Sequence, residues 1–210
     1  MSQSILDPFF DQFVCQFSSL KDQIIFYFTS PIIQNGRESN LSGRVILDMA
    51  LRYGLLWKSR EGQEYLVPVT EKCRQAWGIT EGELFALARV NTPRLLPPLL
   101  CPMREILGDM ARAENEAADV ELSVLTNSRR FLGAAAMLYD EVLAAFAAEI
   151  DSDFYILPSS IHEVLLLPCR GQDRQALETM VTEINAREVR KQDVLSNHVY
   201  QYQKNSGKIV

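Results

Sequence analysis

Residues 153–168 constrain the fold of this chain more than any other stretch. They hold two short apolar runs, Phe154–Leu157 and Ile161–Leu167, on either side of Pro158-Ser159-Ser160. Short apolar runs bounded by turn-forming residues are typical of buried strands, and a proline between them interrupts a continuous strand. We therefore predict two neighbouring strands that meet at residues 158–160.

The flanking segments predict a C-terminal lobe of strands and helices. Runs of β-branched and aromatic residues indicate strands, and apolar residues at helical spacing indicate two helices. The order β-β-α-β-β-α-β predicts an antiparallel or mixed sheet with helices on one face. The expected elements are a hairpin from 121–126 and 131–138, helices at 140–150 and 172–188, and a strand at 199–203 before a frayed end at 205–210.

The N-terminal part predicts a lobe of helices and one hairpin. Asp7-Pro8 starts a helix that ends near Leu20, because Asp is a favourable N-cap and proline a favourable first residue. Thr80-Glu-Gly-Glu83 is a capping box, and we expect Asn91-Thr-Pro93 to end that helix. The other expected elements are a strand at 24–29, a loop at 30–42, a hairpin from 44–57 and 64–69, a short helix at 70–78, an extended segment at 93–102, a helix at 103–110 and an exposed connection at 111–119.

The order of the predicted elements indicates an α+β protein of two domains, residues 1–110 and 120–204. The composition is that of a globular chain. Of the 210 residues, 47% are hydrophobic and 23% charged, and the net charge is −6. An acidic chain repels phosphate backbones, so nucleic-acid binding is disfavoured. We expect no membrane span and no signal peptide, because no apolar run approaches the roughly 18 residues that a spanning helix needs. The four cysteines form no C-x-x-C pair, which favours free thiols in the cytoplasm.

Ser159, Ser160, His162 and Glu163 are the strongest candidates for chemistry. A serine nucleophile with a histidine base requires the imidazole within hydrogen-bond distance of the hydroxyl. Along a strand, Ser160 and His162 share one face about 7 Å apart while Glu163 points to the other, which suits such a pair poorly. No G-x-S-x-G elbow surrounds either serine. The favoured interpretation is structural: the hydroxyls satisfy backbone groups, and His162 is a hydrogen-bonded sheet histidine. Ligand binding by these four residues is the next alternative, ahead of catalysis.

Three further possibilities are weaker. A metal site from His162, Glu163 and His198 is disfavoured, because adjacent strand residues point to opposite faces. Arg94 is a candidate for binding an anion, although pairing with an acidic side chain is favoured. Asn127 is a candidate ligand-binding residue, although turning the predicted hairpin is its favoured role. No P-loop, dinucleotide or EF-hand pattern is present, so we expect no cofactor.

Four motifs of the chain form a recognisable set. They are Leu157-Pro-Ser-Ser-Ile-His-Glu-Val164, Trp77-Gly-Ile-Thr-Glu-Gly-Glu-Leu84, Asn91-Thr-Pro-Arg-Leu95, and Val124-Leu-Thr-Asn127 with Gly133-Ala-Ala-Ala-Met-Leu-Tyr139. Together they resemble an uncharacterised bacterial domain family that is common in anaerobic gut bacteria. The resemblance covers about residues 24–204 and implies no activity, substrate or cofactor. It also implies a shortened version that lacks a further N-terminal segment.

We therefore expect a cytosolic, non-catalytic binding or regulatory module that acts through protein contacts. The reason is that the sequence shows no complete catalytic or cofactor-binding constellation. The alternative is a hydrolase-like enzyme that uses the region of Ser160, His162 and Glu163. A concave pocket that holds these residues together with Arg94 or Asn127 would favour the enzyme.

Overall fold

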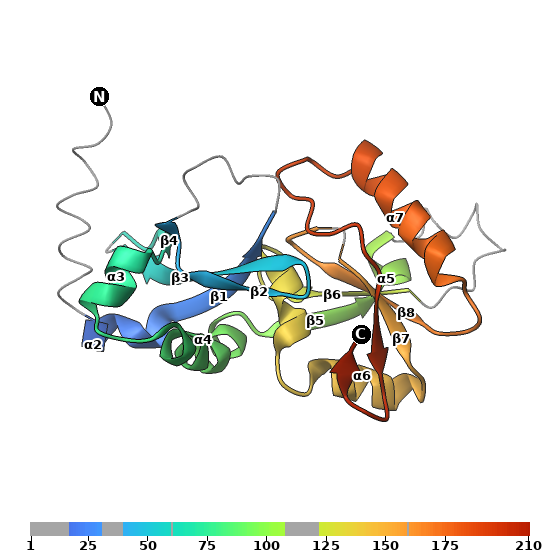
Figure 1. Ribbon diagram of the computed structural model, residues 1–210, viewed down its shortest axis with the longest axis horizontal. Helices are drawn as coiled ribbons and strands as arrows, with labels where there is room; N and C mark the ends of the chain where they lie inside the picture. The colour runs from blue at the N-terminus through green and yellow to red at the C-terminus, as the bar shows by residue number, and fades with distance from the viewer. Residues whose placement is uncertain (1–16, 31–39, 60, 108–121, 159) are drawn as a thin grey trace. The chain divides into compact units, whose positions relative to one another are not determined.

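The computed structural model describes residues 17–30, 40–59, 61–107, 122–158 and 160–210. Within them the chain forms two compact units: unit 1 contains residues 17–27 and 40–95, and unit 2 contains residues 28–30 and 96–210 (Figure 1). Helices and antiparallel sheets in these units confirm the predicted α+β class. The domain ranges 1–110 and 120–204 stay a prediction. Most of the predicted first helix, most of the predicted loop after residue 30, and the predicted connection at 111–119 lie outside the described residues.

A four-stranded sheet forms the centre of unit 1, in the order β1-β3-β2 with β4 also paired to β3. The first half of β3 pairs with β2, from Gly43↔Arg52 to Ile46↔Met49, and the second half pairs with β4. The predicted strand and hairpin are confirmed, but the first arm splits at a tight turn into β2 and β3. The strands are β1 (Ile24–Thr29), β2 (Gly43–Ile46), β3 (Met49–Lys58) and β4 (Glu64–Pro68).

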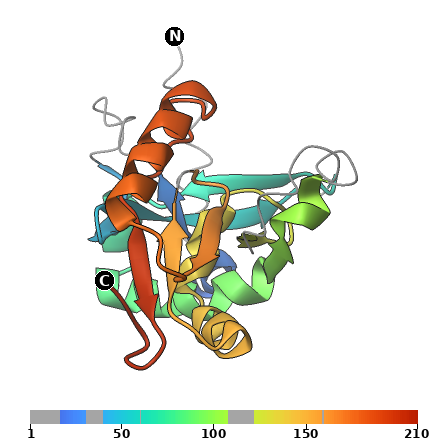
Figure 2. The same ribbon diagram turned by 90° about the vertical axis from the view of Figure 1, so that its right-hand side faces the viewer.

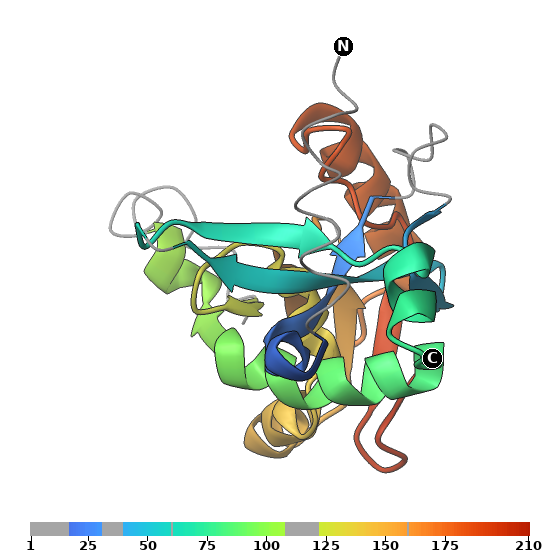
Figure 3. The same ribbon diagram turned by 90° about the vertical axis from the view of Figure 1, so that its left-hand side faces the viewer.

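Helices of different lengths complete unit 1. Thr70 caps α3 by accepting a hydrogen bond from the Cys73 amide at 3.2 Å, as the sequence predicts. The capping box of α4 is also confirmed, because the Glu83 amide donates to Thr80 Oγ1 and the Thr80 amide donates to Glu83 Oε2. Figure 3 shows α4 lying across one face of the sheet. The helices are α2 (Phe17–Leu20), η1 (Lys21–Gln23), α3 (Glu71–Ala76) and α4 (Glu81–Leu95).

The predicted end of α4 at Pro93 is wrong, because the helix continues to Leu95. A proline in a helix removes one backbone hydrogen bond and disfavours the helical region for the residue before it. Here the residue before the proline is Thr92, and its side chain makes two hydrogen bonds. Thr92 Oγ1 donates to the Ala88 carbonyl at 2.6 Å and accepts from the Phe26 amide at 3.0 Å. Contacts with β1 therefore hold the last turn in a conformation that the local sequence disfavours.

A six-stranded antiparallel sheet forms unit 2, in the order β10-β9-β7-β8-β6-β5. The two strands predicted around residue 158 lie side by side, with Phe154↔Pro168 and Leu157↔Leu165 as the ends of their register. A short helix, α5 (Met103–Leu107), follows the edge strand. The strands are β5 (Pro98–Pro102), β6 (Ser123–Asn127), β7 (Phe154–Leu157), β8 (Val164–Pro168), β9 (Tyr200–Gln203) and β10 (Lys208–Ile209).

The two long helices of unit 2 cover opposite faces of this sheet, α6 (Val142–Ile150) on one and α7 (Arg174–Arg187) on the other (Figure 2). On the first face Phe146 of α6 meets Phe154 edge to face, with 4.9 Å between ring centroids. On the second face Val181 of α7 packs with Leu157. The prediction of helices on a single face is therefore wrong. Both faces of β7 and β8 are apolar, so each needs its own cover.

Two other segments differ from the predicted strands. Gly133–Leu138 is a 3-10 helix, η5, not the second arm of a hairpin. A side chain at Gly133 would fall 2.6 Å from the His162 carbonyl oxygen, so this backbone packs too closely for a hairpin arm with alternating side chains. Residues 161–163 form a bend before β8, so strand alternation does not apply to them. The predicted frayed end instead forms β10, which pairs with β9.

None of the described helices has both the length and the apolar character needed to cross a membrane.

Candidate functional site

Three of the six predicted site residues meet in unit 2. The side chains of His162 and Asn127 bind the backbone of residues 128–132. The side chain of Ser160 binds the backbone of the bend that faces this segment. Arg94 belongs to unit 1 and makes its contacts there. Glu163 is half-buried next to β8, and Ser159 lies outside the described residues.

Ser160 and His162 bind backbone groups. Ser160 Oγ accepts from the His162 amide at 3.0 Å, which closes a tight local turn. His162 Nδ1 accepts from the Leu132 amide at 3.2 Å, so the neutral ring carries its hydrogen on Nε2. The Nδ1 lone pair, which a general base would use, is already occupied by a backbone donor. The geometry is that of a histidine that supports the fold.

Asp193 lies at the other nitrogen of the ring. Its Oδ1 is 3.6 Å from His162 Nε2, and its Oδ2 accepts from Arg190 Nε at 2.7 Å. The carboxylate is largely buried, whereas Arg190 is exposed. The Asp193 carbonyl also accepts from the Ile161 amide at 2.8 Å. The segment after α7 thus holds the bend at residues 160–163 through both side chains and backbone.

Asn127 forms the turn after β6, where it is fully buried. Its Oδ1 accepts from the Arg129 amide at 3.0 Å, and its Nδ2 donates to the Phe131 carbonyl at 2.8 Å. The Asn127 carbonyl accepts from the Arg130 amide at 2.9 Å. One side chain therefore replaces the partner strand that these backbone groups would have in a hairpin.

The turn at residues 128–132, here the Phe131 turn, exposes a large apolar side chain. Phe131 is 54% exposed, and its ring centroid lies 5.5 Å from that of His162. Arg130 and Leu132 have φ angles of 52° and 53°, in the left-handed region that costs energy for residues with a side chain. Asn127 and His162 hold this backbone in place.

Sequence reasoning missed Phe131, because it was assigned to a predicted strand and so to the interior. The available signal was the order Asn-Ser-Arg-Arg-Phe, in which an Asn that favours turns precedes two arginines. Arginine and aromatic residues are enriched at protein interfaces.

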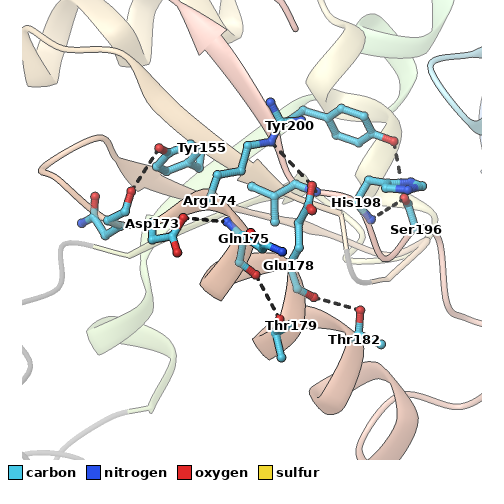
Figure 4. A network of polar contacts seen from close by, with 12 residues as sticks. Tyr155, Asp173, Arg174, Gln175, Glu178, Thr179, Thr182, Ser196, His198 and Tyr200 are labelled. Atoms are coloured by element: carbon cyan, nitrogen blue, oxygen red, sulfur yellow. Dashed lines mark hydrogen bonds and ion pairs between the residues drawn. The ribbon is translucent and has the colours of Figure 1, made fainter.

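A second surface feature of unit 2 is a groove of about 420 Å³ along α7. Polar side chains line it, and Figure 4 shows most of them with their contacts. Sequence reasoning named only His198 among them, as a possible metal ligand. The lining residues are Gln175, Glu178, Thr179, Thr182 and Glu183 of α7, with Asn197 and His198 of the segment before β9.

The groove is shaped by hydrogen bonds between α7 and residues 196–199. Glu178 Oε1 lies 3.4 Å from the Val199 amide that donates to it and 3.5 Å from Arg174 Nε. Ser196 Oγ accepts from the His198 amide at 3.0 Å (Figure 4). Asn185 Nδ2 donates to the Ser196 carbonyl at 3.0 Å. These contacts fix the segment that forms one wall.

Unit 1 contains a different polar cluster at the start of α4. Arg44 binds Glu81 through two hydrogen bonds of 2.7 and 2.5 Å, and the Tyr53 hydroxyl also donates to this carboxylate. The Arg44 guanidinium stacks 3.9 Å above the Phe85 ring centroid. Burial alone would raise the pKa of Glu81, but the hydrogen bonds from Arg44 and Tyr53 together lower it. Burial and the bond to Glu81 raise the pKa of Tyr53.

Arg94 and Asn91 anchor the helical turn before β1. Arg94 Nη2 donates to the Asp22 carbonyl at 2.5 Å and to Asn91 Oδ1 at 3.2 Å. Asn91 Nδ2 donates to the carbonyls of Lys21 and Ile24. Asn91 therefore lies inside α4 and does not end it, contrary to the predicted helix end at residues 91–93. In these two hydrogen bonds, the ones seen among the described residues, the Arg94 guanidinium binds neutral oxygens; pairing with an acidic side chain stays a prediction.

The described residues include no group of three His, Cys, Asp or Glu side chains placed to hold a metal ion. Cys73, Cys101 and Cys169 are free thiols. Burial raises the pKa of Cys169, although a hydrogen bond with Tyr155 acts in the opposite direction. A raised pKa leaves less thiolate, so this cysteine is a poor nucleophile.

A family model described as a family of unknown function, DUF5688, matches residues 5–204. The chain belongs to this family. The match spans both units and includes the Phe131 turn and the α7 groove. No curated protein and no solved structure is detectably similar to the chain.

Proposed function

We propose that this protein is a non-catalytic binding module that contacts a protein partner through the Phe131 turn. The observation that supports it is an exposed Phe131 on a strained backbone that buried polar groups hold in place. Strained backbone persists only where its surroundings enforce it, and it clusters at functional positions. An aromatic side chain next to arginines has the composition of an interface anchor.

The shape of the turn also supports a protein partner over a small molecule. Small-molecule sites are concave and bury most of their ligand. Phe131 instead projects from a turn with Arg129 and Arg130 exposed beside it. An anchor of this kind fills a pocket on the partner.

The hydrolase alternative loses support from the same geometry. A serine hydrolase needs a ring nitrogen with a free lone pair facing the hydroxyl. His162 Nδ1 accepts from the Leu132 amide, and Nε2 faces Asp193. Ester hydrolysis that disappears in His162→Ala but survives in Phe131→Ala would favour the alternative.

The test is quantitative capture from source-cell extract with wild type and Phe131→Ala. We expect at least one protein whose recovery falls about ten-fold or more with the variant, because interface anchors contribute about 2 kcal/mol or more. Val90→Ala is the matched control, since Val90 is also an exposed apolar residue, at 69%, and belongs to α4. Thermal unfolding of all three proteins checks that the fold is retained. Equal capture by wild type and both variants would contradict the proposal.

We further propose that the protein is bacterial, works in the cytoplasm and binds no nucleic acid. The motif resemblance supports the bacterial source, the free thiols of the cysteines in the described residues fit a reducing compartment, and the net charge of −6 disfavours phosphate backbones. Fractionation of the source cell, with an antibody to the protein, tests the location.

A further inference from the structure

Two hydroxyls in the α7 groove can act toward a ligand only as hydrogen-bond acceptors. Thr179 Oγ1 donates to the Gln175 carbonyl at 3.0 Å, and Thr182 Oγ1 donates to the Glu178 carbonyl at 2.8 Å. Each hydroxyl has a single hydrogen, so both can only accept from a molecule in the groove. Figure 4 shows these two hydroxyls along α7 beside Glu178.

The charged groups of the groove point to the same kind of ligand. Glu178 and Glu183 both line it, and among the described residues Glu183 makes no ion pair. Arg174 Nε lies 3.5 Å from Glu178 Oε1, so the charge of Glu178 is partly offset by its own helix, and Glu183 is the main source of negative charge for a ligand. The chain as a whole has a net charge of −6, which adds to the attraction for cations.

Asn185, which contacts the groove lining through Asn197, has a buried acceptor that lacks a donor in the part of the chain that the structure describes. Asn185 is only 5% exposed, and its Nδ2 donates to Oδ1 of the lining residue Asn197 at 2.8 Å. The Oδ1 of the same carboxamide is buried and has no hydrogen-bond partner among the described residues. A buried acceptor of this kind costs free energy until a donor reaches it.

We propose that the α7 groove is a binding site for a primary ammonium or guanidinium group. Glu183 and Glu178 supply the charge, and the hydroxyls of Thr179 and Thr182 accept the N–H donors of the ligand. The volume of about 420 Å³ accommodates a polyamine or a single lysine or arginine side chain. The site is independent of the Phe131 turn, because no residue is shared.

Calorimetric titration of the full chain with two probes tests the proposal, spermidine as a free amine and acetyl-Gly-Lys-Gly-amide as a peptide amine. We expect saturable binding of at least one probe that weakens as salt is added, because exposed charges are screened. Glu183→Gln should weaken this binding about three- to five-fold, the size of an exposed ion pair. Thr179→Val, which removes an acceptor and keeps the shape of the side chain, should also weaken probe binding.

Glu188→Gln is the matched control, since Glu188 is an exposed acid at the C-cap of α7 and does not line the groove. Equal weakening by Glu183→Gln and Glu188→Gln would overturn the proposal, as would the absence of saturable binding for both probes. Binding of spermidine alone identifies a free amine as the ligand class, and binding of the peptide alone identifies a protein side chain. Phe131→Ala should leave probe binding unchanged, so failure of either proposal is distinguishable from failure of the other.

Discussion

Each unit of the protein contains a partly buried polar cluster, and the two clusters are organised differently. In unit 1 the charges of Arg44 and Glu81 bind each other, and the Arg44 guanidinium stacks on the Phe85 ring. In unit 2 the polar groups of Asn127 and His162 bind backbone amides and carbonyls of the Phe131 turn. The first cluster joins strands to a helix. The second supports a segment of backbone that has no strand partner.

The difference shows why the cluster in unit 2 is the better candidate for function. The Arg44–Glu81 ion pair needs no ligand to explain it, because its charged groups stabilise each other and the guanidinium stacks on an aromatic ring. The cluster in unit 2 instead stabilises two residues with positive φ and leaves about half of the Phe131 side chain exposed. The hydrogen bonds of this cluster hold the apolar side chain of Phe131 at the surface, which supports the proposed binding of a protein partner.

Gly133→Ala should have the largest effect of the changes considered. The new Cβ would fall 2.6 Å from the His162 carbonyl oxygen and 2.7 Å from the Asn127 amide nitrogen, and both are backbone atoms that cannot rotate away. We expect the free energy of unfolding to fall by roughly 3 kcal/mol or more, measured by urea denaturation. A loss below about 1 kcal/mol would show that the Phe131 turn is softer than this geometry implies.

Asn127→Ala should come next, with a loss of roughly 2–3 kcal/mol in the free energy of unfolding, because several backbone groups lose their partner at once. Thermal and urea unfolding measure the loss. Hydrogen exchange at the amides of Arg129 and Phe131 should accelerate, while the amides of β3 should keep their protection. Acceleration throughout the chain would mean that Asn127 supports the whole unit and not the turn in particular.

Glu81→Gln tests the closed cluster of unit 1 and should cost about 1–2 kcal/mol at neutral pH. Because the folded-state pKa of Glu81 lies below the ordinary value of 4.5, its contribution is present above that pH and is lost as the pH falls through the lowered pKa. Urea denaturation from pH 7 to pH 3 should therefore show the gap between wild type and variant closing below about pH 4.5. A gap that stays constant across this range would remove the ionised carboxylate as its cause.

Gly82→Ala should have the smallest effect and the opposite sign. Gly82 lies in the first turn of α4, where a Cβ would have only Thr80 Oγ1 near it, at 3.9 Å. Alanine has a higher helix propensity than glycine, so the free energy of unfolding should rise by about 0.5–1 kcal/mol. Thermal unfolding measures the gain. A destabilised variant would indicate that the start of α4, next to the Glu81 cluster, is packed more tightly than this spacing implies.

Many elements of the fold could be predicted because their signals are local. β1 and β7 match the predicted ranges at both ends, and the capping box of α4 forms as expected. Both long helices of unit 2 begin and end within about two residues of their predictions, the usual uncertainty at helix ends. In each case the residues that determine the element lie inside it or directly next to it.

The candidate site was only partly predictable. The sequence pointed to His162 and Asn127 and favoured structural roles for both over ligand contact, but it did not predict the Phe131 turn whose backbone both of them bind. Asp193 lies far along the chain from His162, and no pattern joined them. The groove residues other than His198 were also missed, because Glu178 and Thr182 look like ordinary exposed positions on an amphipathic helix.

The sequence by itself determined the α+β class and most strands and helices, because hydrophobic periodicity, caps and strand propensity act within a few residues. Only the tertiary structure decided whether Pro93 ends α4 and whether residues 133–138 pair as a strand. It also decided that Phe131 is exposed. These outcomes depend on contacts across long stretches of chain, such as Thr92 with Phe26 and His162 with Leu132. Such contacts outweigh local preferences of about 1 kcal/mol, and they leave no local pattern in the sequence.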